Sequence, residues 1–139
     1  MNSKLLFFVL ILIVVSVSVK AQTCILDIGS NNVTNITNTF QLNKEQASAL
    51  DSLRNQLISE RDLQEGEVKK LLETHPQSTP EELLVLARKH KALEDSMFET
   101  TITYDQKFIS LFNERQYERY VLLCQSANRT PIGILEDER

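Results

Sequence analysis

The chain has 139 residues, with 15 basic and 19 acidic side chains, which gives a formal net charge of −4 at pH 7. An acidic chain without a basic stripe argues against nucleic acid as a partner and against binding to anionic membrane surfaces. The length predicts a single domain.

Residues 1–21 have the pattern of a secretory signal peptide. Lys4 supplies a short positive start, residues 5–15 form an unbroken apolar run, and small residues lead up to Ala21. Gln22 is therefore the predicted first residue of the mature chain. A membrane anchor is the competing interpretation, but the run is shorter than the roughly 20 residues that a spanning helix needs. We expect a periplasmic or secreted protein with no stable membrane insertion after cleavage.

The chain contains two cysteines, Cys24 near the predicted mature start and Cys124 in the last helical stretch. In an exported protein an even number of cysteines is typical of a disulfide. A Cys24–Cys124 bridge closes a loop of about 100 residues and contributes up to roughly 4.7 kcal/mol in the chain-entropy model. The alternative is two unpaired thiols, one packed in a helix interface and one loose near the terminus.

Residues 22–41 are rich in Thr and Asn and show no helical period, which predicts an extended N-terminal lead docked through Cys24 and Ile25. Residues 42–126 are predicted to form a helical domain. At the other end, residues 127–139 contain Pro and Gly and are predicted to be a flexible tail.

Within the domain, helices are predicted over residues 43–74, from Pro80 to about residue 112, and from about 114 to 125. Pro76 ends the first helix and Pro80 suits the first position of the second. No strand pattern or glycine-rich loop occurs. The predicted fold is all-α, a long antiparallel helical hairpin followed by a short C-terminal helix.

One short pattern occurs twice. Leu42-Asn43-Lys44-Glu45-Gln46 is matched by Phe112-Asn113-Glu114-Arg115-Gln116, an apolar residue followed by Asn, two polar residues and Gln. Asn is a good N-cap, a Gln three residues later closes a capping box, and the preceding apolar residue packs on the new helix. The repeat therefore predicts two helix starts built alike, at Asn43 and Asn113.

The predicted hairpin is thin for its length. A single pair of long helices buries one stripe of each helix, and Phe98, Ile102 and Phe112 lie off the main stripe. A homodimer, or a surface left open for partners, would use this apolar area. The alternative is that the lead and the last helix cover all of it.

Catalytic and metal-binding patterns are weak. His75 precedes Pro76 in a turn, and His90 falls in the helical stripe, where a hydrogen-bonded core histidine is commoner than a ligand. No Cys-x-x-Cys or His-x-x-x-His pattern occurs. The remaining metal alternative is a site shared across a dimer by two copies of His90. We expect no enzyme activity, no cofactor and no metal site within one chain.

The paired motif resembles the repeated Leu-Thr-x-x-Gln pentapeptide of the Spy/CpxP family of bacterial periplasmic proteins, with Asn in place of Thr in both copies. The replacement keeps the capping role of that position. Residues 105–112, which lead into the second copy, are also similar to the end of the long helix in that family. The resemblance covers residues 40–125.

The resemblance implies a helical hairpin that dimerises into a thin curved cradle. It also implies an ATP-independent chaperone or envelope stress-response protein that holds unfolded clients on apolar patches. The alternative is a non-enzymatic regulatory subunit that docks on an envelope sensor domain, with a metal-responsive version. Client-binding candidates are the apolar residues of the hairpin stripes, although the same stripes must also hold the hairpin together: Leu50, Leu53, Leu57, Leu86, Leu93 and Met97.

Overall fold

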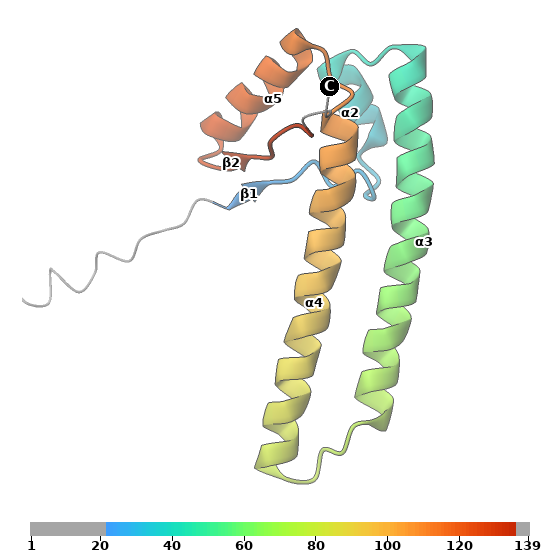
Figure 1. The fold of residues 1–139 in the computed structure, drawn as a ribbon, viewed down its shortest axis with the longest axis vertical. Helices are drawn as coiled ribbons and strands as arrows, with labels where there is room; N and C mark the ends of the chain where they lie inside the picture. The colour runs from blue at the N-terminus through green and yellow to red at the C-terminus, as the bar shows by residue number, and fades with distance from the viewer. Residues whose placement is uncertain (1–21, 136–139) are drawn as a thin grey trace, which may run out of the picture.

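The computed structural model describes residues 22–135, and it is built from helices with one pair of very short strands (Figure 1). The elements in chain order are β1 (Thr23–Cys24), α2 (Val33–Phe40), α3 (Lys44–Thr74), α4 (Pro80–Ile109), α5 (Glu114–Ser126) and β2 (Thr130–Pro131). The all-α prediction is confirmed. The predicted signal peptide, residues 1–21, lies outside the described residues, as do residues 136–139 of the predicted tail.

Helices α3 and α4 lie side by side as an antiparallel hairpin (Figure 1). They contain 31 and 30 residues, so each is about 45 Å long at 1.5 Å per residue. At the turn, Thr79 caps α4 in a capping box with Glu82, and Pro80 occupies the first turn. Helix α4 ends at Ile109, earlier than predicted. The next residues form tighter turns, in which, for example, the Leu111 N–H donates to the Phe108 carbonyl.

The hydrophobic core lies at the end of the hairpin that is far from its turn. Here α2, α5 and both ends of the described chain pack against α3 and α4 (Figure 1). In the turn-side half of the hairpin, Leu86 is the one buried hydrophobic residue among those described. None of the helices in residues 22–135 combines the length and the apolar character needed to cross a membrane.

The prediction of an extended lead over residues 22–41 is wrong for its second half, because residues 33–40 form α2. Ile36 and Phe40 are buried and Val33 packs against the core. Their spacing of three and four residues is a short helical stripe, which the Thr and Asn residues between them obscured. The first part of the lead, residues 22–31, contains the short strand β1 and no helix. We call this segment the arm.

The flexible-tail prediction is wrong for the first part of residues 127–139. Thr130 and Pro131 pair in parallel with Thr23 and Cys24, and Ile132 is buried in the core. The Ile132 N–H donates to the Tyr120 hydroxyl at 2.9 Å, and that hydroxyl donates to the Cys24 carbonyl at 2.6 Å. Tyr120 therefore holds both ends of the described chain against α5.

The predicted disulfide between Cys24 and Cys124 is present, with 5.6 Å between the Cα atoms. It joins the arm to α5 across a sequence separation of 100 residues. The alternative of two unpaired thiols is therefore wrong.

We predict that replacing both cysteines by serine lowers the free energy of unfolding by about 3–5 kcal/mol, because the loop that the bridge closes is long. Urea denaturation followed by circular dichroism measures this change. Ser48→Ala, at an exposed position of α3 outside the bridge, is the control and should change the free energy by less than about 0.5 kcal/mol. An unchanged urea midpoint in the cysteine variant would contradict the prediction.

Candidate functional site

Both copies of the repeated motif form capping boxes at helix starts. The Asn43 side chain accepts from the Gln46 backbone N–H at 2.8 Å, and the Gln46 side chain accepts from the Asn43 N–H at 3.2 Å. The matching distances for Asn113 and Gln116 are 3.0 and 2.9 Å. The structure thus places the motif at the starts of α3 and α5.

The two motif glutamines also bind each other, which the repeat alone did not predict. Gln46 Nε2 donates to Gln116 Oε1 at 2.7 Å, and Gln116 Nε2 donates to Gln46 Oε1 at 3.0 Å. The second N–H of Gln46 donates to the Leu111 carbonyl at 2.8 Å, and that of Gln116 to the Phe40 carbonyl at 2.9 Å. Both side chains are buried, and every donor and acceptor of the two amides has a partner.

The apolar residues of the motif complete this junction. Leu42 and Phe112 are half-buried and pack against the core. The ring of Phe112 lies 4.7 Å from that of Phe40 and 5.2 Å from that of Phe108, measured between centroids. The motif residues therefore form a structural junction.

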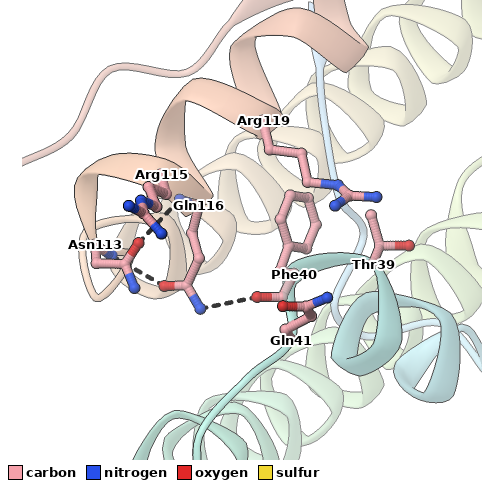
Figure 2. A pocket seen from close by; sticks show the side chains of 7 residues that line it. All are labelled: Thr39, Phe40, Gln41, Asn113, Arg115, Gln116 and Arg119. Atoms are coloured by element: carbon pink, nitrogen blue, oxygen red, sulfur yellow. Dashed lines mark hydrogen bonds between the residues drawn. The ribbon is translucent and has the colours of Figure 1, made fainter.

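A polar pocket of about 360 Å³ opens beside the junction, between the end of α2 and the first turns of α5 (Figure 2). Arg115 and Arg119 line it together with Thr39, Gln41 and Asn113. Both arginine side chains are exposed. The lining residues therefore offer several hydrogen-bond donors to the pocket.

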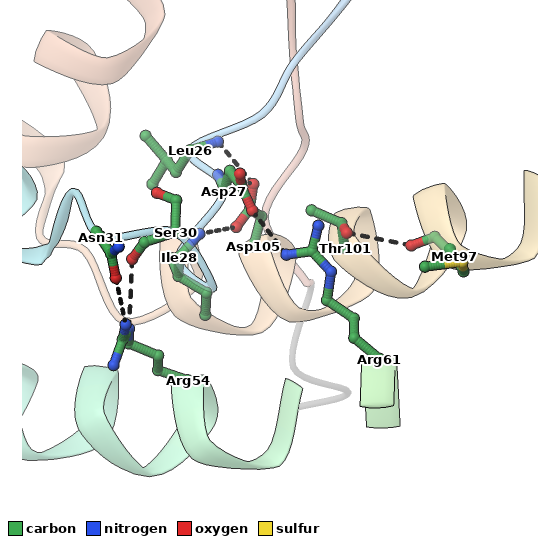
Figure 3. Close-up of polar contacts among 10 residues, drawn as sticks. All are labelled: Leu26, Asp27, Ile28, Ser30, Asn31, Arg54, Arg61, Met97, Thr101 and Asp105. Atoms are coloured by element: carbon green, nitrogen blue, oxygen red, sulfur yellow. Dashed lines mark hydrogen bonds and ion pairs between the residues drawn. The ribbon is translucent and has the colours of Figure 1, made fainter. Parts of the chain in front are cut away.

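A second buried polar centre was missed at the sequence level. Asp105, inside α4, is completely buried, and its carboxylate accepts three consecutive backbone N–H groups of the arm (Figure 3). The distances are 2.6 Å from Leu26, 2.9 Å from Asp27 and 3.1 Å from Ile28. Burial raises the pKa of the Asp105 carboxyl, and the three N–H donors oppose that rise.

Two arginines of α3 add to the contacts of the arm. Arg61 forms an ion pair with Asp27 at 3.2 Å, and Arg54 donates to the Ser30 carbonyl at 3.4 Å (Figure 3). Asp27 has a positive φ of 50°, which turns the backbone so that successive N–H groups face the Asp105 carboxylate. The sequence does show that Asp105 lies four residues after Thr101 and three before Phe108, and therefore on the same helix face as both.

The structure divides the six client-binding candidates into two groups. Leu50, Leu57 and Leu86 are buried, so they serve the packing of the hairpin. Leu53, Leu93 and Met97 are half-buried. Apolar side chains that are more exposed than these candidates occur elsewhere on the hairpin and on α5: Leu63, Leu72, Leu83, Leu84, Val85, Phe98, Leu122 and Leu123.

The two histidines lie apart from any cluster of ligands. His75 follows α3 and its Nδ1 lies 2.8 Å from the Pro76 carbonyl oxygen. His90 is half-buried with its Nδ1 3.7 Å from the Glu94 carboxylate. Within residues 22–135, no three His, Cys, Asp or Glu side chains are grouped so as to hold a metal ion.

Comparison of the chain with protein-family models, with curated proteins and with solved structures finds no match. The resemblance to the Spy/CpxP family therefore depends on the two motif copies and the helical pattern.

We predict that the glutamine pair is strongly coupled. Gln46→Ala and Gln116→Ala should each lower the free energy of unfolding by about 1–3 kcal/mol, because each leaves a buried amide without its partner. The double variant should lose less than the sum, by about 0.5–3 kcal/mol. Urea denaturation of the four proteins measures the coupling. Gln56→Ala, which removes an exposed amide bonded to Ser52, is the control; strict additivity of the pair would contradict the prediction.

We also predict that Asp105→Asn lowers the free energy of unfolding by about 1–3 kcal/mol, because the new amide N–H₂ faces backbone donors. The control is Asp95→Asn on the same helix, where an exposed ion pair with Lys91 is lost and a change below about 1 kcal/mol is expected. Equal effects of the two substitutions in urea denaturation would show that the arm does not depend on the buried carboxylate.

Proposed function

We propose that the protein is an exported, ATP-independent protein-binding chaperone or envelope stress-response protein of the Spy/CpxP type. The observation that carries the proposal is the turn-side half of the α3–α4 hairpin. Leu63 is 72% exposed and Leu84 62% exposed, although both belong to helices that continue into a well-packed core. Exposed apolar side chains on a helical hairpin suit transient contact with the apolar segments of unfolded chains.

Charged side chains also lie on the exposed faces of the same two helices. In each of the ion pairs Lys69–Glu73 and Lys91–Asp95, the two partners are four residues apart in the helix and exposed. Such pairs add little stability but keep the surface hydrated. Apolar patches among hydrated charges favour weak, reversible and salt-sensitive binding over permanent association.

A second copy of the chain is the other occupant that we propose for this surface. Two hairpins that pack along their open faces would form the thin curved homodimer expected of the family. A dimer and client binding are compatible, because each helix has two faces outside the α3–α4 contact. Multi-angle light scattering measures the mass of the protein and hence the number of copies.

The test is light scattering of an aggregating model client, with the chain from Gln22 onwards under oxidising conditions and without ATP. We expect suppression at near-stoichiometric ratios, because each chain contributes one hairpin with exposed apolar side chains. The double variant Leu63→Ser/Phe98→Ser should lose most of the suppression. Leu122→Ser, at an exposed apolar residue on α5, is the control and should retain it.

No suppression by a sample that is helical by circular dichroism would contradict the general-chaperone proposal. The remaining hypothesis would then be the dedicated regulatory subunit, which binds one envelope partner and no generic client. Equal loss in the hairpin and α5 variants would contradict the assignment of the surface to the hairpin.

A further inference from the structure

The arm is bound by the rest of the chain in the way that a protein binds an extended peptide. Three consecutive N–H groups, of Leu26, Asp27 and Ile28, donate to the Asp105 carboxylate, and the Cys24 carbonyl accepts from Tyr120. These bonds involve only backbone groups of the arm. We call the residues that hold the arm the arm seat: Leu57, Arg61, Asp105, Tyr120 and Cys124.

Side chains of the arm add a simple apolar preference. Ile28 is completely buried in the core, and Ile25 and Leu26 pack against the core as half-buried residues. Gly29 lies so close to α3 that a Cβ atom there would be 3.1 Å from Leu57 Cδ2. The seat therefore fits an extended segment with apolar side chains and a small residue at its closest approach.

Besides the backbone that runs from the arm into α2, the disulfide is the one covalent link between the arm and the seat within residues 22–135. Cys124 is completely buried, whereas Cys24 is half-buried. A tethered segment competes for its site at an effective concentration of about millimolar, and a second tether raises that value. Cleavage of the bridge therefore lets a free peptide compete with the arm.

We propose that the arm seat is a second polypeptide-binding site, closed in the oxidised protein by the arm and opened to extended apolar segments when a dithiol reductant cleaves Cys24–Cys124. This inference goes beyond the proposed function, because it concerns a site on the packed end of the molecule and not the hairpin surface.

The chemical step is a thiol–disulfide exchange. A thiolate of the dithiol attacks the sulfur of Cys24, the less buried of the two cysteines, the bond between the two protein sulfurs breaks, and Cys124 leaves as a thiolate that takes up a proton. The second thiol of the reductant then displaces Cys24 from the mixed disulfide. Two electrons pass to the protein cystine, and the dithiol becomes a cyclic disulfide.

The experiment uses the full chain with Cys24→Ser, which leaves Cys124 as a single thiol beneath the arm. The probe is a synthetic peptide of residues 22–31 that keeps its cysteine, in a glutathione redox buffer, and intact-mass spectrometry quantifies the peptide disulfide on Cys124. The matched control peptide carries Ile28→Asp. The rate at which iodoacetamide alkylates Cys124 in the folded protein is divided by the rate in the urea-unfolded protein. This ratio measures how often the arm leaves its seat.

We expect capture of the native peptide by a protein that remains helical, with capture of the Ile28→Asp peptide lower by about tenfold or more, because that peptide must bury a charge in place of an apolar side chain. Equal capture of both peptides would overturn the proposal, as would no capture of either. Loss of helical circular dichroism in the Cys24→Ser protein would also overturn it, since the arm would then be an inseparable part of the core. The client assay with the oxidised wild-type protein does not open the seat, so its failure affects the proposed function alone.

Discussion

The reciprocal hydrogen bonds between Gln46 and Gln116 are the interaction on which the packed end of the molecule depends. Each glutamine caps its own helix, binds the other glutamine and reaches one further backbone carbonyl, at Leu111 or Phe40. The pair thereby links the end of α2, the starts of α3 and α5, and the connection that follows α4. A buried amide pair with every partner present is also specific, because any shift of one helix start leaves polar groups unpaired.

The arm is the second constraint, and it works by a different principle. The glutamine pair joins helix ends, whereas Asp105 supplies acceptors to a segment whose N–H groups have no helix partner. The buried carboxylate is costly to desolvate, and three N–H donors offset that cost. With the disulfide and Tyr120, this arrangement closes the core over Ile28 with a non-helical segment.

Local patterns predicted the starts of α3, α4 and α5, although they missed α2, and the even cysteine count predicted the disulfide, but the buried polar contacts between distant residues were missed. The capping boxes at Asn43, Thr79 and Asn113 depend on residues three apart, and the helix starts lie where the patterns put them. The contact between Gln46 and Gln116 spans 70 residues and leaves no local pattern. The contacts of Asp105 with the arm were missed for the same reason. Its partners lie 77 to 79 residues away and are backbone N–H groups, which almost every residue has.

The molecule is thus strongly asymmetric along its length. One end combines the core, the disulfide and the two buried polar centres, whereas the other is a bare pair of helices. Even the seam of that pair is partly polar, since Gln64 donates to Thr100 at 2.9 Å and its own Oε1 has no hydrogen-bond partner among residues 22–135. Few buried apolar contacts and an unpaired buried acceptor give low local stability. A well-packed base that presents a locally adaptable apolar hairpin is a physical arrangement suited to the weak binding of many chains that we propose.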